Sequence, residues 1–255
     1  MCRGKKPTKK YFSIIGSAHS FGCYVEKPFG ELIAEKYKLE CLNLGFAGVG
    51  PAYHLRMPYW DLINKGKFCI IQIMSARSER NNKFDNYGEN IGIYEGVNMT
   101  PLEFWTKQVL KLNKESLMFL INETRNNYIN NMIYVLKRIN VPKILFYFSD
   151  RELEYKTDLN SLFGIWNRFP HFVNREIVNK IKPYSDCYVH CVTSRGMPQK
   201  LDVFIKDNFL SKYYISHPNV DEMKNYNNYY PSPEMHFDAS KKLEAICEFI
   251  LRRHI

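Results

Sequence analysis

Two short segments rich in glycine and serine carry the clearest chemical signal in the sequence. The first, Tyr11-Phe-Ser-Ile-Ile-Gly-Ser-Ala-His-Ser-Phe-Gly22, is an apolar run that breaks at small residues, and the second is Asn43-Leu-Gly-Phe-Ala-Gly-Val-Gly50. Each run stops just before a predicted helix, where backbone N–H groups at the helix start can hold an anion or an oxyanion. We therefore expect Gly16, Asn43 and Gly45 to contribute to one composite anion- or oxyanion-binding site.

The hydroxyl and imidazole groups near these loops suggest acyl-transfer or hydrolytic chemistry. Ser17 is the candidate nucleophile, with His236 as the general base that accepts its proton and Glu234 as the carboxylate that orients the imidazole. Ser20 is a second candidate hydroxyl, and His19 is a candidate substrate contact. A structural role as a loop or N-cap hydroxyl remains open for Ser17, and a place at the start of a helix remains open for His236.

A third cluster of polar residues follows the third apolar run of the chain. Arg77 and Arg80 could bind an anionic group through the guanidinium fork. Ser75 and Ser78, beside them, are candidate substrate contacts. The alternative is a solvated loop with no ligand.

The elements that must position these residues alternate between strands and helices. Short apolar runs predict strands at Tyr11–Gly16, Glu40–Leu44, Phe68–Met74, Pro142–Ser149 and Asp186–Val192. Helices are predicted at Pro28–Lys38, Ala52–Asn64, Val173–Ile181 and Glu234–Arg253, and at Thr100–Asn140 with a break near Leu112–Lys114. Thr100-Pro-Leu-Glu103 predicts an N-cap with proline at N1 and glutamate at N3.

This alternation predicts a three-layer, flavodoxin-like α/β fold with a five-stranded, mainly parallel sheet, because parallel neighbours need crossover connections. Long irregular segments at Ser75–Met99, Asp150–Pro170 and Thr193–Pro233 all follow predicted strand ends. Since ligands in such folds bind beyond the carboxyl ends of the strands, we expect one site at that edge of the sheet.

Composition limits the other possibilities. The chain has 255 residues, and we expect one domain over residues 11–255 after a flexible basic tail at 1–10. The formal charge is +10, but the Lys and Arg residues are scattered, which argues against a nucleic-acid partner and fits an anionic small molecule.

No apolar run is long enough to span a bilayer, and no signal peptide is recognised. The seven cysteines form no CxxC pair, which favours free thiols in the cytoplasm. Neither a metal nor a cofactor is expected, and nothing in the sequence predicts an oligomeric state.

The motifs together resemble the SGNH (GDSL-like) hydrolase superfamily over the chain from about Tyr11 onward. In that family the first loop carries Gly-Asp-Ser, the second a glycine oxyanion donor, the third Gly-x-Asn-Asp, and the last Asp-x-x-His. Here Gly16-Ser-Ala18 places alanine at the nucleophile position, Asn43-Leu-Gly45 fits the second block, and Ser75-Ala-Arg-Ser78 lacks the asparagine. Pro233-Glu-Met-His236 keeps the histidine but not the aspartate, so the resemblance implies a degenerate triad.

More closely, the segments Gly16–Phe29, Asn43–Pro51, Ile70–Ser78 and Tyr229–His236 resemble an uncharacterised bacterial SGNH-like group associated with polysaccharide genes. The resemblance implies an enzyme that acts on a carbohydrate ester or transfers an acyl group on a glycan. Two alternatives stay open. One is sulfotransferase-like group transfer from a nucleotide donor, and the other is a non-catalytic glycan-binding module.

Overall fold

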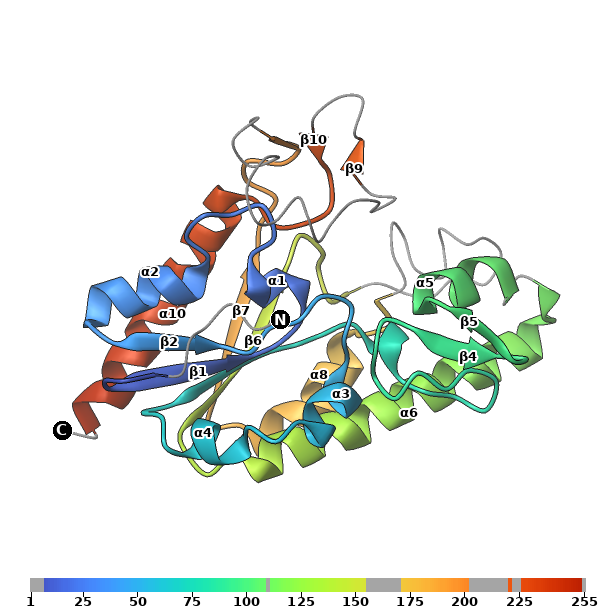
Figure 1. Ribbon diagram of the computed structural model, residues 1–255, viewed down its shortest axis with the longest axis horizontal. Coiled ribbons are helices and arrows are strands. Elements are labelled where there is room, and N and C mark those ends of the chain that lie inside the picture. The colour runs from blue at the N-terminus through green and yellow to red at the C-terminus, as the bar shows by residue number, and fades with distance from the viewer. Residues whose placement is uncertain (1–6, 109–110, 155–170, 202–219, 222–225, 254–255) are drawn as a thin grey trace.

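Five parallel strands form the central sheet of the computed structural model, in the order β2-β1-β3-β6-β7. The structure describes residues 7–108, 111–154, 171–201, 220–221 and 226–253 (Figure 1). The strands of the sheet are β1 (Tyr11–Ile15), β2 (Glu40–Asn43), β3 (Cys69–Gln72), β6 (Lys143–Ser149) and β7 (Cys187–Val192). This confirms the five-stranded parallel sheet predicted from the sequence.

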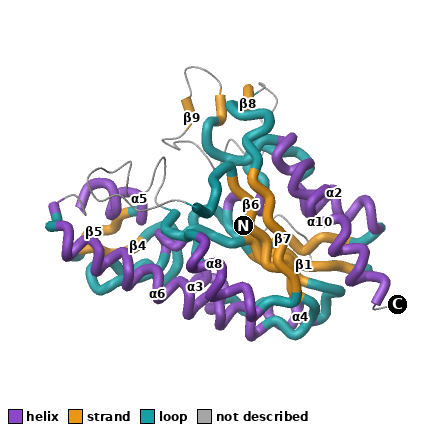
Figure 2. The backbone as a smooth tube through the Cα atoms, turned by 180° about the vertical axis from the view of Figure 1, so that it is seen from behind, coloured by secondary structure: helices purple, strands orange, loops and turns teal. Residues whose placement is uncertain are grey.

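Helices cover both faces of the sheet (Figures 1 and 2). One face packs on α2 (Phe29–Tyr37) and α10 (Pro233–Arg253), and the other on α3 (Pro51–Arg56), α6 (Lys114–Arg138) and α8 (Arg175–Ile181). The inner strands are apolar on both faces because both faces are buried. Ile70 of β3, for example, is fully buried and lies between Ile14 and Ile144 of its neighbouring strands. The three-layer α/β fold is thereby confirmed.

Shorter elements connect and extend these layers. They are α1 (Ala18–Phe21), α4 (Trp60–Asn64), η1 (Ala76–Ser78), β4 (Gly92–Tyr94), β5 (Val97–Met99), α5 (Pro101–Glu103), η2 (Phe104–Gln108), η4 (Lys182–Tyr184), β8 (Gln199–Lys200), β9 (Val220–Asp221) and β10 (Tyr226–Asn227). β4 and β5 form an antiparallel hairpin beside α6, and β8, β10 and β9 form a small sheet above the carboxyl ends of the main strands (Figure 1).

Local sequence explains where the helices begin. Asn113 caps α6 by accepting a hydrogen bond from the Ser116 N–H at 2.8 Å, so the predicted break before this helix is confirmed. The predicted capping box is also present, because Thr100 and Glu103 exchange hydrogen bonds between side chain and backbone.

Two predictions about the elements were wrong. The single helix predicted at Ala52–Asn64 is divided into α3 and α4, because Met57 precedes a proline and takes an extended conformation with ψ of 142°. The segment Ser75–Met99, predicted to be an irregular loop, contains η1 and the β4–β5 hairpin. The loop prediction missed the hairpin because its strands are only three residues long and largely exposed.

The strand order places β1 between β2 and β3, so the chain passes to opposite sides of β1 in its first two crossovers. The gap between β1 and β3 is therefore the topological switch point, where open α/β sheets bind their ligands. No described helix has the length and apolar character needed to cross a membrane. None of the six described cysteines forms a disulfide.

Candidate functional site

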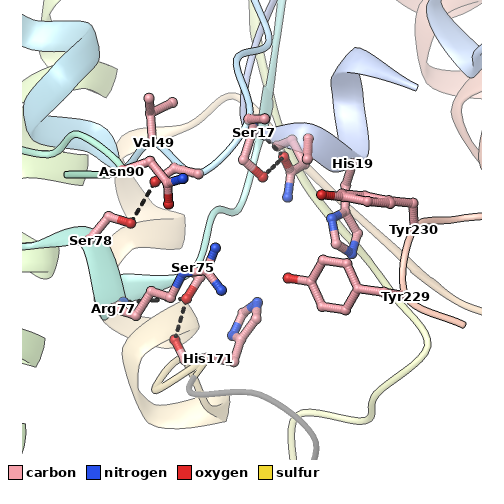
Figure 3. Close-up of a pocket in the computed structure, with 14 residues that line it drawn as sticks. Ser17, His19, Val49, Ser75, Arg77, Ser78, Asn90, His171, Tyr229 and Tyr230 are labelled. Carbon is pink, nitrogen blue, oxygen red and sulfur yellow. Dashed lines mark hydrogen bonds between the residues drawn. The ribbon is translucent and has the colours of Figure 1, made fainter. Parts of the chain in front are cut away.

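A small cavity lies at the carboxyl edge of the sheet, above the gap between β1 and β3 (Figure 3). Its volume is about 50 Å³, which is enough for a few water molecules or one small chemical group. The loops after β1, β2 and β3 line it together with two later segments of the chain. The lining residues are Ser17, Ala18, His19, Ala47, Gly48, Val49, Gln72, Ser75, Arg77, Ser78, Asn90, His171, Tyr229 and Tyr230.

Ser17 lies in the cavity wall at the start of α1. Its N–H and its hydroxyl both donate hydrogen bonds to the Gln72 side-chain oxygen, at 2.8 and 3.1 Å. The Gln72 amide nitrogen in turn donates to the Ile73 carbonyl at 2.7 Å, which fixes the orientation of the amide. An amide oxygen holds a hydroxyl in place but is too weak a base to remove its proton. The arrangement therefore positions Ser17 without activating it.

The second loop is locked to the first by side-chain hydrogen bonds. Asn43 donates from its amide nitrogen to the Ser20 carbonyl at 2.8 Å and accepts from the Gly45 N–H at 3.0 Å. Ser20 is fully buried, and its hydroxyl donates to the Ser17 carbonyl at 3.0 Å. A Cβ at Gly45 would lie 2.5 Å from the Ser20 hydroxyl oxygen and 2.8 Å from the Phe21 nitrogen. Gly45 thus serves the close approach of two loops, and Asn43, Gly45 and Ser20 are not among the residues that line the cavity.

Gly16 also allows a close approach, in this case between the first loop and β3. A Cβ there would lie 2.8 Å from the Gln72 side-chain oxygen, so the loop can approach β3 only with glycine at this position. The Gly16 carbonyl is hydrogen-bonded to the buried His54 imidazole Nε2 at 3.0 Å. Burial lowers the pKa of His54 to about 4, opposed by its hydrogen bond to Gly16, so this ring is neutral at neutral pH.

The loop after β3 brings a positive charge to the cavity. Arg77 is only 8% exposed, and its guanidinium group reaches toward the centre of the cavity (Figure 3). Burial lowers the pKa of Arg77, an effect opposed by Tyr229 and Tyr230. Ser75 accepts a hydrogen bond from the Arg77 N–H at 3.3 Å, and Ser78 donates to the Gly48 carbonyl at 2.7 Å. Arg77, Ser75 and Ser78 therefore lie together at the cavity.

Arg80 points elsewhere. Its side chain is exposed, and its carbonyl accepts a hydrogen bond from Asn127 of α6 at 3.0 Å. It is not among the residues that line the cavity. The two arginines predicted to bind one anion thus differ in placement, because Arg77 lines the cavity whereas Arg80 is exposed.

Two histidines line the cavity. Burial lowers the pKa of His19 to about 4, opposed by the charge of Asp150. Burial also lowers the pKa of His171 to about 3, reinforced by the nearby positive charge of Arg151. Both rings are neutral at neutral pH and can donate or accept hydrogen bonds. His19 was expected near the substrate, whereas His171 was not among the residues expected at the site.

His236 lies in another layer of the molecule. It is fully buried in α10, its Nδ1 accepts a hydrogen bond from the Phe29 N–H at 3.2 Å, and its ring stacks on the Phe29 ring at 5.8 Å. The Phe148 ring contacts His236 on one side and His19 on the other, at centroid distances of 5.3 and 6.3 Å. The structure therefore does not bring His236 to the cavity that contains Ser17.

Glu234 does not share the environment of His236 either. It is exposed in the first turn of α10, whereas His236 faces the core, and helix positions two residues apart do not face each other. The predicted arrangement of Ser17, His236 and Glu234 as one catalytic unit thus receives no support from their placement.

A segment that was not among the predicted site residues, Asn227–Tyr230, lies at the cavity. The segment reads Asn227-Asn-Tyr-Tyr230 and precedes a proline. Asn227 accepts hydrogen bonds from the N–H groups of Tyr229 and Tyr230 at 3.0 and 2.9 Å, and it donates to the Tyr230 carbonyl at 2.8 Å. It therefore holds both tyrosines against the cavity. Asparagine and tyrosine are common in loops, so their residue types gave no sign of this role in the sequence.

Glu79 lies directly behind the Gly48–Gly50 wall of the cavity. Its carboxyl oxygens accept hydrogen bonds from the Ala52 N–H at 3.1 Å and the Asn131 side chain at 2.6 Å. Burial raises the pKa of Glu79 to about 7, opposed by these two hydrogen bonds.

Among the residues that the structure describes, no three His, Cys, Asp or Glu side chains are grouped so as to hold a metal ion.

The strand order, the helical layers and the cavity at the carboxyl edge of the sheet define a three-layer α/β protein. The sequence matches the family described as a domain of unknown function (DUF6473) over residues 1–212, and the chain belongs to that family. No curated protein matches the sequence significantly.

Several solved structures have a similar fold at low sequence identity. A phospholipase A1 from Streptomyces albidoflavus NA297 is 9% identical, with a TM-score of 0.51 over 92% of this chain and 98% of that chain. An extracellular lipase from Streptomyces rimosus is 10% identical, with a TM-score of 0.50 over 93% and 99%. A family two carbohydrate esterase from Clostridium thermocellum, solved with cellohexaose, is 10% identical, with a TM-score of 0.46 over 97% of this chain and 66% of that chain. The similarities to the phospholipase and the lipase show the fold alone.

Proposed function

We propose that the cavity binds a small anionic group of a carbohydrate ligand, with Arg77 as its anchor and without a covalent step. The observation that carries this proposal is the buried guanidinium group of Arg77 at the cavity centre (Figure 3). Tyr229 is a hydrogen-bond partner of this group, and an anion in the cavity would compensate the buried charge more fully. A guanidinium group offers two parallel N–H donors, which suit a carboxylate, sulfate or phosphate.

The placement of the triad candidates supports binding rather than ester hydrolysis. Position 18, where the SGNH pattern has its nucleophile, is alanine. The neighbouring Ser17 hydroxyl donates to an amide oxygen, and His236 is buried between the sheet and α2. A serine nucleophile needs a base within hydrogen-bond reach, and neither of these contacts supplies one.

The remaining cavity groups suit the hydroxyls of a sugar. Ser17, Ser75 and Tyr229 contribute hydroxyl groups, and the neutral imidazoles of His19 and His171 offer both donors and acceptors. Because the cavity holds only about 50 Å³, we infer that one end of the ligand enters and the rest stays outside. The sequence predicted a carbohydrate or another anionic small molecule as the substrate, and the ligand proposed here is an acidic carbohydrate.

Isothermal titration calorimetry tests this proposal. Glucuronate, glucose 6-sulfate, glucose 6-phosphate, adenosine 3′,5′-bisphosphate and neutral glucose are titrated into the wild-type protein, Arg77→Gln and Arg80→Gln. Arg80→Gln is a matched control, since it removes a nearby guanidinium group that lies outside the cavity. We expect at least one acidic ligand to bind, glucose not to bind, and only Arg77→Gln to lose affinity. Equal loss in both variants, or no binding of any anion, contradicts the proposal.

The second candidate function is ester hydrolysis or acyl transfer that uses Ser17 and His171. The observation that favours it is that both residues line the same cavity. In this mechanism the Ser17 oxygen attacks the ester carbonyl, His171 accepts the hydroxyl proton, and the imidazolium returns it to the departing alcohol. Acetylated glucose is the test substrate. Turnover that is abolished in both Ser17→Ala and His171→Gln supports this function, and absence of turnover in the wild-type protein contradicts it.

A further inference from the structure

One histidine in the cavity wall has ring nitrogens that are open to a ligand. His19 lies in the short helix α1, and its ring contacts the Phe148 and Tyr229 rings edge to face, at centroid distances of 6.3 and 6.1 Å. None of the described residues is hydrogen-bonded to either ring nitrogen of His19, and neither nitrogen is fully enclosed. The neighbouring rings therefore hold this imidazole in place while its polar atoms stay available to the cavity.

Charges from other segments of the chain act on His19. Burial lowers the pKa of His19 to about 4, the carboxylate of Asp150 opposes this effect, and the guanidinium group of Arg77 adds to it. The Tyr229 hydroxyl stays neutral, because burial raises its pKa although Arg77 opposes the change. Arg77 and His19 reach into the cavity from η1 and α1, so an anion that binds between these elements acts on both side chains (Figure 3).

The other histidine of the cavity has a neighbour of the opposite charge. Burial lowers the pKa of His171 to about 3, and the positive charge of Arg151 adds to this effect. His19 also lowers the pKa of His171, so a proton on His19 makes a second proton on His171 still less favourable. A proton that enters the cavity with an anion is therefore more stable on His19, which faces the carboxylate of Asp150.

An anion changes the balance of charge at His19 in two ways. It offsets the charge of Arg77, which disfavours the protonated ring, and it stabilises that protonated ring directly. An opposite charge within about 4–6 Å shifts a pKa by about 1–3. By linkage, a ligand that raises the pKa of a group binds more tightly when that group is protonated. Anion affinity should then rise as the pH falls from neutral toward the pKa of the free ring.

We propose that His19 is the second residue that binds the anion in the cavity, and that its ring takes up a proton from solvent as the anion binds. This inference rests on the proposed function, because it requires an anion at Arg77. Arg77 and protonated His19 then hold the anion together, whereas His171 stays neutral and hydrogen-bonds to the rest of the ligand. The cavity thereby binds anions more tightly under mildly acidic conditions than at neutral pH.

Isothermal titration calorimetry at pH 5.0 and pH 7.5 tests this inference with glucuronate and glucose 6-sulfate, which stay ionised at both values. If the anion raises the pKa of His19 by about 2, affinity is about tenfold higher at pH 5.0. Repeating the titration at pH 5.0 in two buffers of different ionisation enthalpy counts the protons, and we expect close to one proton per ligand. This count uses the wild-type protein and does not depend on the folding of any variant.

Variants assign the proton to a residue. We expect His19→Gln to lose both the proton uptake and the pH dependence of binding. Glu79→Gln is the control for a second group that titrates between the two pH values, and it should keep both properties. Asp150→Asn removes the exposed carboxylate that favours the proton on His19, and it should weaken the pH dependence.

The outcomes separate this inference from the proposed function. Anion binding without proton uptake contradicts the role of His19 and still supports an anion site at Arg77. Proton uptake that persists in His19→Gln and is lost in His171→Gln also contradicts the role of His19. If neither anion binds at either pH, the proposed function itself fails, and this inference fails with it.

Discussion

The side-chain oxygen of Gln72 accepts hydrogen bonds from both the backbone N–H and the hydroxyl of Ser17, at 2.8 and 3.1 Å. Gln72 is the last residue of β3 and is only 2% exposed, so this contact ties the loop after β1 to the neighbouring strand. Ser17, the candidate nucleophile, is therefore hydrogen-bonded to the buried amide of Gln72, beside the gap between β1 and β3.

Replacing Gln72 should cost more stability than replacing Ser17. Gln72→Met keeps the side-chain length but leaves the Ser17 N–H without its acceptor, and we expect a loss of about 1–3 kcal/mol in the free energy of unfolding. Ser17→Ala removes only the hydroxyl bond and should cost about 1 kcal/mol. Urea denaturation measures both values. A larger loss in Ser17→Ala than in Gln72→Met contradicts this account of the contact.

His236 should behave as a core residue. We expect His236→Ala to lower the free energy of unfolding by about 2–4 kcal/mol, because it removes a buried ring and the acceptor of the Phe29 N–H. The half-exposed neighbour Phe237 is the control, and Phe237→Ala should change stability by less than about 1 kcal/mol. Anion affinity of the folded variants should not change. Unchanged stability combined with lost binding or lost turnover indicates a catalytic role instead.

Glu79 should make stability depend on pH between about 4.5 and 7. Its pKa in the folded protein is raised to about 7 from 4.5, so the folded state binds the proton more tightly than the unfolded state. The resulting stabilisation is fully present below pH 4.5 and is lost as the pH rises to about 7, with a total on the order of 3 kcal/mol.

The measurement compares unfolding of the wild-type protein and Glu79→Gln across this range. The buried His19, His54 and His171 have lowered pKa values and change stability in the opposite direction, but they are common to both proteins. The difference between the two proteins therefore isolates Glu79. A difference that stays constant from pH 4.5 to 7 shows that Glu79 does not titrate in this range.

A side chain at position 45 should destabilise the protein unless the neighbouring Ser20 is made smaller. We expect Gly45→Ala to cost about 1–3 kcal/mol, because the new Cβ would lie 2.5 Å from the Ser20 hydroxyl oxygen. Ser20→Ala in the same chain should recover part of this loss, although the Phe21 nitrogen at 2.8 Å still restricts the position. Strictly additive effects in the double-mutant cycle are incompatible with this contact.

The sequence was sufficient to predict the layers of the fold, since buried strands and capped helices leave local signals. The apolar run around Ile70 and the capping box at Thr100–Glu103 are examples. The hairpin at residues 92–99 was missed because it buries little and so shows no periodic pattern. The helix predicted at 52–64 is divided because Met57 precedes a proline, an effect that the prediction did not include.

The site was less predictable because its residues meet only through tertiary structure. Residues that follow strand ends are brought to the cavity by the topology of the sheet. These residues are Ser17, His19, Ser75, Arg77 and Ser78. By contrast, the resemblance drew attention to His236 and away from Tyr230, because a histidine in a familiar motif is more conspicuous than a tyrosine. His171 carries no local signal, since it follows a long segment that was predicted to be irregular. Gln72 could have been noticed as a polar residue that ends a buried apolar strand.

The central claim is that Arg77 binds an anion inside this cavity. The most direct test is a crystal structure determined from crystals soaked in glucuronate. We predict difference density for the carboxylate within hydrogen-bond distance, about 2.7–3.2 Å, of the Arg77 guanidinium nitrogens. Density found only elsewhere on the protein, with the cavity occupied by water alone, contradicts the account.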